Sequence, residues 1–121
     1  MARNLLTVEQ SATLVEVAAA MTARQVGAAL VVAEGRLRGI VTERDVLRAV
    51  ASGSVDGHVS GWMTADPETV EADESTQQAA VVMIHGGFRH LPVLEGGRPV
   101  GIVSIRDLMR VALEDVSPRG V

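Results

Sequence analysis

The sequence predicts a mixed α/β (α+β) fold made of two strand–helix–strand–strand–helix units that pack against each other. The chain repeats itself after 62 residues without a gap, so that residues 39–48 (GIVTERDVLR) return as residues 101–110 (GIVSIRDLMR). Between residues 7–50 and residues 69–112, 14 of 44 positions are identical. A unit of about 45–60 residues rarely buries enough apolar surface by itself, so we expect the two units to share a core.

Composition and charge exclude several classes of function. The chain has 121 residues, is 47% hydrophobic and 21% charged, and carries a formal net charge of −4. An acidic balance without a basic cluster argues against nucleic-acid and anionic-membrane surfaces. The sequence contains no cysteine, which removes disulfides, thiolate metal ligands and cysteine nucleophiles. With no apolar run of membrane-spanning length and too short an apolar start for a signal peptide, we expect a cytoplasmic protein.

The first helix of each unit is predicted from its start, its apolar face and its end. Capping boxes open it at residues 13–16 and 75–78. Glycines are predicted to end it at Gly27 and at Gly86-Gly87. The inward face predicted from helical spacing consists of Leu14, Val17, Ala18 and Met21, matched by Ala79, Ala80 and Met83.

A hairpin and a second helix follow in each unit. Two apolar runs flank a short Gly-containing turn, residues 34–36 or 96–98, which is typical of a β-hairpin. The helix then begins at Thr42 or Ser104. Its predicted inward residues are Val46, Leu47 and Val50, matched by Leu108, Met109 and Ala112. We divide the chain into a first unit (1–54), a linker (55–62), a second unit (63–114) and a flexible tail (115–121).

The turn between the hairpin and the second helix has two interpretations. In the structural one, the hydroxyl of Thr42 or Ser104 and the acid three residues later, Asp45 or Asp107, form a helix-capping box worth about 0.5–2 kcal/mol. In the functional one, the free N–H groups of the helix start, the hydroxyl and a neighbouring arginine bind a phosphate, and the aspartate accepts ribose hydroxyls. The arginines in question are Arg44 and Arg106. These residues alone leave the two interpretations about equally supported.

The repeated Gly-apolar-apolar-Thr/Ser-x-x-Asp stretch, together with His90-Leu91-Pro92-Val93 and the Val59…Met63-Thr64 segment, resembles a tandem pair of CBS domains, a Bateman module. The likeness covers residues 5–113 and is to the small stand-alone bacterial type. It implies two units packed about a pseudo-twofold axis, with two clefts that in this family commonly bind AMP, ADP, ATP, S-adenosylmethionine or NAD. By the same shift Met1-Ala2 falls on Met63-Thr64, so the first unit lacks the usual lead-in and one cleft should be more open.

The resemblance also implies roles for individual residues. Asp45 and Asp107 would hold ribose hydroxyls, whereas Thr42, Ser104, Arg44 and Arg106 would bind or neighbour the phosphate. The backbone that would line the adenine lies near Ala28, Ala29, His90 and Leu91, and at the strand starts around Val8 and Val70.

No pattern in the sequence indicates catalysis or a metal site. The three histidines share no helical face, and the acids between residues 66 and 74 are explained as a solvated connection. We find no phosphate-binding Gly-rich loop and no nucleophile motif, and therefore expect a non-enzyme without obligatory cofactor. The leading hypothesis is a sensor that binds an adenine nucleotide, forms a homodimer through its helices and acts on an unidentified protein partner. The alternative is a ligand-free scaffold dimer in which the polar turns are only helix caps.

Overall fold

The structure, a computed structural model, describes residues 5–116, with side chains to residue 110. The expected lead-in position Met1-Ala2, the side chain of Ala112 and the tail after Val116 lie outside the described residues.

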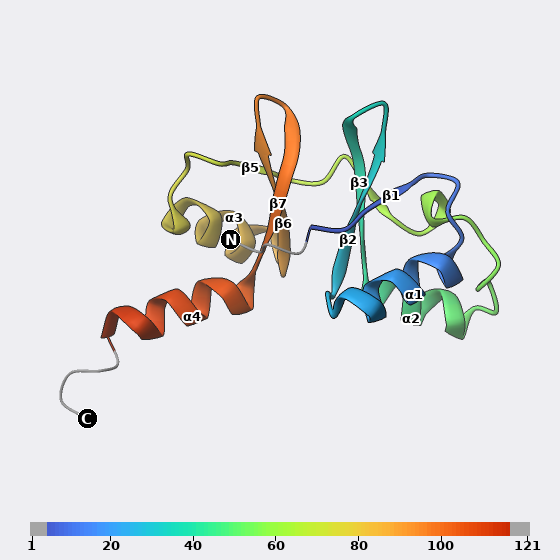
Figure 1. The fold of residues 1–121 in the computed structure, drawn as a ribbon. Coiled ribbons are helices and arrows are strands. Elements are labelled where there is room, and N and C mark those ends of the chain that lie inside the picture. Colours follow the sequence, from blue (N-terminus) through green and yellow to red (C-terminus); the bar gives the residue numbers. More distant parts are fainter. Residues whose placement is uncertain (1–4, 117–121) are drawn as a thin grey trace.

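Each unit has the predicted order strand, helix, strand, strand, helix (Figure 1). The first unit consists of β1 (Thr7–Glu9), α1 (Leu14–Arg24), β2 (Ala28–Ala33), β3 (Arg36–Thr42) and α2 (Glu43–Ala51). The second consists of β5 (Val70–Glu71), α3 (Thr76–Gly86), β6 (His90–Glu95), β7 (Arg98–Ser104) and α4 (Ile105–Val116). The connection between the units contains a short 3₁₀ helix, η1 (Val59–Gly61), and the strand β4 (Thr64–Ala65).

The two sheets have equivalent topology and register. In the first sheet, of order β1-β2-β3-β4, β1 runs parallel to β2, while β2 and β3 form the antiparallel hairpin. The second sheet, β5-β6-β7, repeats this arrangement, including a register shift at Val93/Leu94 that matches the one at Val31/Val32. The turn residues Glu34 and Gly35, with φ values of 55° and 76°, explain the two-residue link, because tight hairpin turns of this kind need positive φ at both positions.

The connection between the units packs on the first unit. β4 pairs antiparallel with β3, with Gly39 opposite Ala65. Val59 is fully buried in the first core, and the N–H of Leu14 donates to the carbonyl of Gly57 at 3.0 Å. Trp62 and Met63, which follow Val59, are partly buried against the same core.

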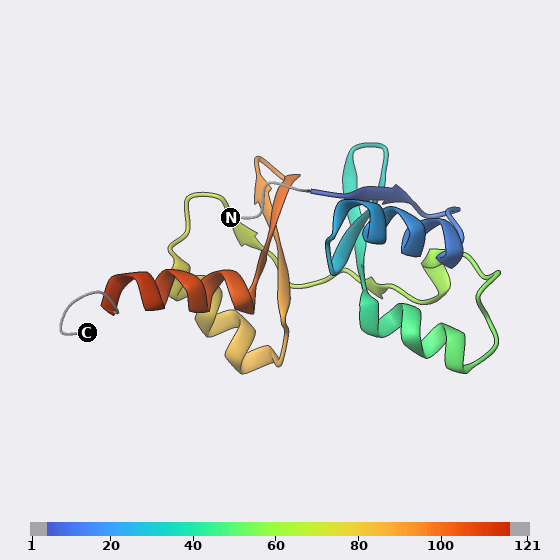
Figure 2. The ribbon, with the colours of Figure 1, turned by 60° about the horizontal axis from the view of Figure 1, so that its bottom comes forward.

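The sheets meet because β2 and β3 are buried on both faces. Successive side chains of a strand point to opposite faces. Ala29, Val31 and Val41 accordingly pack with α1 in the first core. The alternate residues Ala28, Leu30 and Ile40 instead form a separate cluster with Ile102 of β7. In two views, the hairpins stand side by side in the middle, with α1 and α2 on one side and α3 and α4 on the other (Figures 1 and 2).

The second helices of the units, α2 and α4, do not bury the face that was predicted to point inward. Leu47, Val50 and Met109 were predicted to point inward, but they are 69%, 54% and 59% exposed. In α2 the buried residues are Asp45 and Ala49, four positions apart. The cause is the polar turn: because the Asp45 carboxylate bonds back to Thr42, position 45 faces inward and the apolar residues at 47 and 50 are turned outward.

The ends of the first helices follow the prediction in part. Thr13 and Glu16 form the complete capping box at α1, and the Ser75 hydroxyl accepts from the N–H of Gln78 at α3. Gly87 ends α3 in the left-handed conformation. The prediction that Gly27 ends α1 is wrong: Gln25 takes the left-handed position, with its N–H bonded to the last turn.

The close approach of β4 to Gly39 of β3 yields a stability prediction. A methyl group at Gly39 would lie 2.8 Å from the carbonyl oxygen of Thr64, a backbone atom that cannot move without displacing β4. We expect Gly39→Ala to lower the free energy of unfolding by about 1–3 kcal/mol, measured by chemical denaturation. The control is Gly61→Ala, whose added methyl meets nothing within 4 Å. Equal effects of the two substitutions would contradict the explanation.

Candidate functional site

Both polar turns open into one cleft between the two units. The cleft has a volume of about 600 Å³. It is bounded by the N-terminal ends of α2 and α4, the starts of β2 and β6, and the segment that joins β4 to β5 (residues 66–69), which we call the crossover. Instead of a separate cleft for each turn, the structure therefore brings the two turns together. The predicted residues that line it are Ala28, Thr42, Arg44, Asp45, His90, Leu91, Ser104, Arg106 and Asp107.

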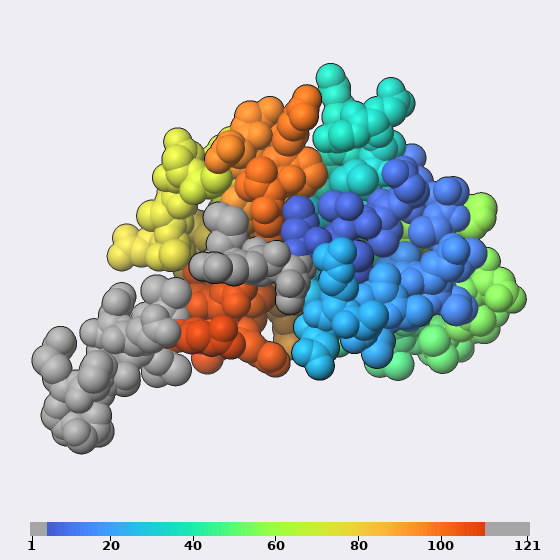
Figure 3. All heavy atoms as spheres, in the orientation of Figure 1, coloured from blue at the N-terminus to red at the C-terminus, as the bar shows by residue number. Residues whose placement is uncertain are grey.

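A second hollow, which we call the hairpin-tip groove, lies at the opposite end of the sheets. It has a volume of about 850 Å³ and lies between the two hairpin turns, which project from the top of the molecule in Figure 3. Pro67 of the crossover borders both hollows. Although the groove is the larger, its lining comes mainly from exposed turn residues and includes neither polar turn. The convergent polar groups therefore lie in the cleft.

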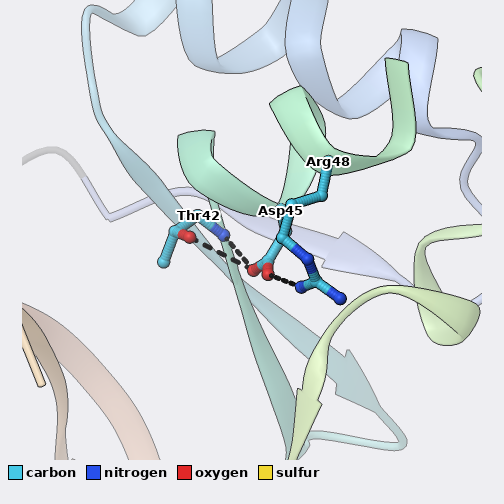
Figure 4. Close-up of polar contacts among 3 residues, drawn as sticks. All are labelled: Thr42, Asp45 and Arg48. Carbon is cyan, nitrogen blue, oxygen red and sulfur yellow. Dashed lines mark hydrogen bonds and ion pairs between the residues drawn. The ribbon is translucent and has the colours of Figure 1, made fainter. Parts of the chain in front are cut away.

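In the first polar turn, the Asp45 carboxylate is engaged on both oxygens (Figure 4). The backbone N–H and the hydroxyl of Thr42 donate to Oδ2 at 2.9 Å and 3.2 Å. Nη1 of Arg48 donates to Oδ1 at 3.0 Å, and the Arg48 guanidinium also lies 5.5 Å from the centre of the Trp62 ring. These contacts explain how a carboxylate can be 8% exposed, since a buried charge requires hydrogen-bond partners.

The second polar turn has the same backbone geometry, but its carboxylate accepts fewer hydrogen bonds from the described residues. The N–H of Ser104 donates to Oδ2 of Asp107 at 3.0 Å, and the N–H of Asp107 donates to Oγ of Ser104 at 3.1 Å. Within residues 5–110, the ion pair between Arg48 and Asp45 has no counterpart between Arg110 and Asp107. Among the residues whose side chains are described, Oδ1 of Asp107 accepts no hydrogen bond, and Arg110 lines the cleft beside it.

His90 stands beside the second turn and faces the first unit. It is the cross-strand partner of Ser104, as Ala28 is of Thr42. Burial lowers the pKa of His90 below its ordinary value, while the nearby carboxylates of Glu43 and Asp107 raise it and Arg89 lowers it. The imidazole is therefore mainly neutral near pH 7, and an anion bound beside it would favour its protonation.

Three predicted residues do not reach the cleft. Ala29 is fully buried and points into the first core, on the other face of β2 from Ala28. Val8 packs against the same core, and Val70 is buried in the second core. Strand alternation explains this placement, because it sends neighbouring side chains to opposite faces. Leu91 borders the cleft although its side chain is buried in the second core.

Several cleft residues were not predicted from the sequence. The most informative are Glu43 at the start of α2, Arg110 one turn into α4, Thr64 of β4, and the crossover residues Pro67 and Glu68. The repeat itself carries a signal for Glu43. The two turns are otherwise similar, and Glu43 is the one position where they differ in chemical type, since it aligns with Ile105. The crossover lines the cleft through long-range placement, for which the sequence carries no local signal.

Among the described residues, no three His, Cys, Asp or Glu side chains gather as a metal site would require. Over the same part of the chain, every helix is too short or too polar to cross a membrane.

The lowered pKa of His90 predicts a pH dependence of stability. Between the pKa of folded His90 and the ordinary value near 6.5, the unfolded chain binds more protons than the folded chain, so the free energy of unfolding rises with pH. The penalty is absent above this window and complete below it. We expect His90→Gln to flatten this rise in denaturation experiments from about pH 5 to pH 8. His85→Gln, at an exposed position outside the cleft, is the control, and an unchanged slope in His90→Gln would contradict the assignment.

Comparison with known proteins agrees with the geometry. The CBS domain family matches residues 1–52 and 58–114. An uncharacterised protein of Acidianus ambivalens is 38% identical over 109 residues, which are 88% of this chain and 66% of that protein, so the chain spans just under two thirds of this relative.

Two solved structures are similar over nearly their whole length. A CBS domain protein of Pyrobaculum aerophilum, complexed with AMP, is 34% identical with a TM-score of 0.86, and 94% of this chain covers 92% of it. The CBS domain pair of protein MJ0100, in complex with 5′-methylthioadenosine and S-adenosyl-L-methionine, is 25% identical with a TM-score of 0.88, and 95% of this chain covers 93% of it. Two matched repeats with this shared architecture show that the chain belongs to the CBS domain family and contains a tandem CBS pair.

Proposed function

We propose that the chain is a non-catalytic regulatory module that binds an adenine nucleotide, of the AMP, ADP or ATP class, in the cleft between its two CBS units. The observation that carries this proposal is the convergence of both polar turns, with their hydroxyls, aspartates and arginines, on a single cleft of about 600 Å³. Pockets that bind small molecules usually combine such a volume with a few convergent polar groups. S-adenosylmethionine and NAD are further candidates of the same class.

The proposed roles follow from the chemistry of each side chain. A carboxylate offers about four acceptor sites, and the known contacts of Asp107 leave Oδ1 for ribose hydroxyls. The hydroxyl of Ser104 and the first N–H groups of α4 can donate to a phosphate, and the planar guanidinium of Arg106 suits a phosphate better than a point charge would. The apolar wall formed by Ile40 and Ile102, where the sheets meet, suits a purine ring.

Regulation would follow from the position of the cleft. A ligand that contacts both units favours the arrangement of the units in which it binds more tightly, by no more than the difference in binding free energy between arrangements. We propose that this shift is read by a protein partner or by a change of assembly in the cytoplasm. Two relatives with the same fold support the ligand class, since one was solved with AMP and the other with adenosine-containing sulfur compounds.

One observation favours the alternative of a ligand-free scaffold. Asp45 already has partners on both oxygens, and those contacts explain the first polar turn as a helix cap. In this alternative both turns would serve only to start α2 and α4. The binding experiment decides between the two functions.

Calorimetric titration with AMP, ADP, ATP, NAD and S-adenosylmethionine tests the proposal. We expect saturable binding of at least one compound, and a rise of about 2.7 kcal/mol in the free energy of unfolding at a ligand concentration 100-fold above its Kd. Asp107→Asn should weaken this binding tenfold or more, because a hydrogen bond to a charged acceptor contributes about 1.5–3 kcal/mol. Asparagine is preferred to alanine because it keeps an acceptor for the Ser104 N–H.

The matched control is Asp73→Asn, an exposed acid before α3 and outside the cleft, which should bind as the unaltered protein does. If none of the five compounds binds at sub-millimolar concentration, the nucleotide proposal fails and the scaffold alternative stands.

We also propose that the chain forms a homodimer through its helices. Both units expose apolar side chains there, with Leu47 of α2 69% exposed and Ile84 of α3 72% exposed. A second copy offers the same surfaces, so a twofold contact can cover them reciprocally.

Light scattering at micromolar concentration should therefore give twice the chain mass of 12.7 kDa. Leu47→Glu and Ile84→Glu should shift this mass toward the monomer, because burying a charge in an apolar interface is costly. Val100→Glu, at an apolar residue of β7 that is 41% exposed and away from the helices, is the control. A monomeric mass for the unaltered protein would contradict the proposed dimer.

A further inference from the structure

The two halves of the cleft share one backbone arrangement but differ in their side chains. After each hydroxyl residue, the next N–H donates to an equivalent carbonyl: Glu43 to Gly27 at 3.1 Å, and Ile105 to Arg89 at 2.9 Å. The backbone at the two positions is thus held in the same way. What differs is the chemistry, because an acid and a glycine in the first half correspond to an isoleucine and an arginine in the second.

Glu43 places a carboxylate on the wall of the cleft, although the residue as a whole is exposed. Its Oε1 lies 3.2 Å from the point that a Cβ on Gly27 would occupy, and Nε2 of His90 lies 3.7 Å from the same point. The carboxylate therefore fills the space that the missing side chain of Gly27 leaves open, and it faces the second unit. Its counterpart, Ile105, is partly buried and packs against the second core instead.

The positive charges of the cleft are also distributed unequally. The second half carries Arg89, Arg106 and Arg110, with His90 beside them. In the first half the counterpart of Arg110 is Arg48, which is bound to Asp45 and lies over Trp62. The first-half arginine that lines the cleft is Arg44, and it stands between two acids in the sequence, Glu43 and Asp45.

We infer that Glu43 is a specificity-determining residue: its carboxylate excludes a phosphate group from the half of the cleft beside Thr42, so that a phosphate is accepted beside Ser104. The physical reason is repulsion between like charges, which at contact distance acts even at an exposed residue such as Glu43 and is stronger beside the protein than in bulk water. The proposed function supplies the ligand class on which this inference rests. The cleft would then hold one phosphate-bearing ligand per chain, in a single orientation.

The test uses inorganic phosphate as the probe, because it reports anion binding without any need for adenine recognition. Backbone amide shifts from nitrogen-15 NMR would be followed during the titration. We expect phosphate to shift the amides of residues 104–107 and to leave those of residues 42–45 nearly unchanged. In Glu43→Gln, phosphate affinity at residues 42–45 should rise about fivefold or more, because the opposing charge is gone.

A matched control distinguishes an effect of the position of Glu43 from an effect of the protein's net charge. Glu68→Gln removes the same charge from the crossover, which also borders the cleft, and should change phosphate affinity at both turns alike. A parallel titration with AMP should give one equivalent per chain for the unaltered protein and two for Glu43→Gln.

The outcomes separate the inference from the proposed function. If phosphate shifts both turns equally in the unaltered protein, shifts neither, or shows the same preference after Glu43→Gln, the inference is overturned whatever AMP does. If AMP does not bind but phosphate shows the preference and loses it in Glu43→Gln, the inference holds and the nucleotide function fails.

Discussion

The structure depends on the contact between the two sheets. Ala28, Leu30 and Ile40 of the first unit meet Ile102 of the second, and a fully buried aliphatic side chain contributes about 1.5–3 kcal/mol. Either unit alone would expose this apolar face to water, so neither is complete without the other. The same contact also creates the functional geometry, because β3 and β7 end next to the interface and deliver their polar turns to one cleft.

The polar turn both starts a helix and lines the cleft. Its carboxylate accepts the N–H of the residue three positions earlier, which starts the helix and turns that helical position inward. In the first unit, Arg48 donates to the other oxygen of Asp45 and lies over the Trp62 ring. In the second unit, Oδ1 of Asp107 accepts no hydrogen bond from the residues whose side chains are described. In the proposed function, one carboxylate can cap the helix and bind a ligand because it offers about four acceptor sites, more than the cap uses.

Repetition kept the backbone of the two units the same while their cleft-facing side chains became different. The hairpin register, its irregularity and the hydrogen bond after each hydroxyl residue are equivalent in both units. Such features are set by the backbone, so they tolerate changes of side chain at exposed positions. The divergence at Gly27 and Arg89, and at Glu43 and Ile105, gives a pseudosymmetric scaffold an electrostatically asymmetric site.

The sequence by itself determined the repeat, the order of elements, the hairpin turns and the two polar turns, because each depends on interactions within a few residues. Six of the residues that line the cleft belong to the two polar turns, and three more, Ala28, His90 and Leu91, were expected there from the family resemblance. The sequence misjudged Leu47, Val50 and Met109, because a helix with apolar residues on two faces is oriented by its packing and capping. Tertiary structure alone decided that both turns share one cleft, that the crossover lines it, and that Glu43 faces His90. These contacts join residues far apart in the chain, and their geometry is set by how the sheets meet.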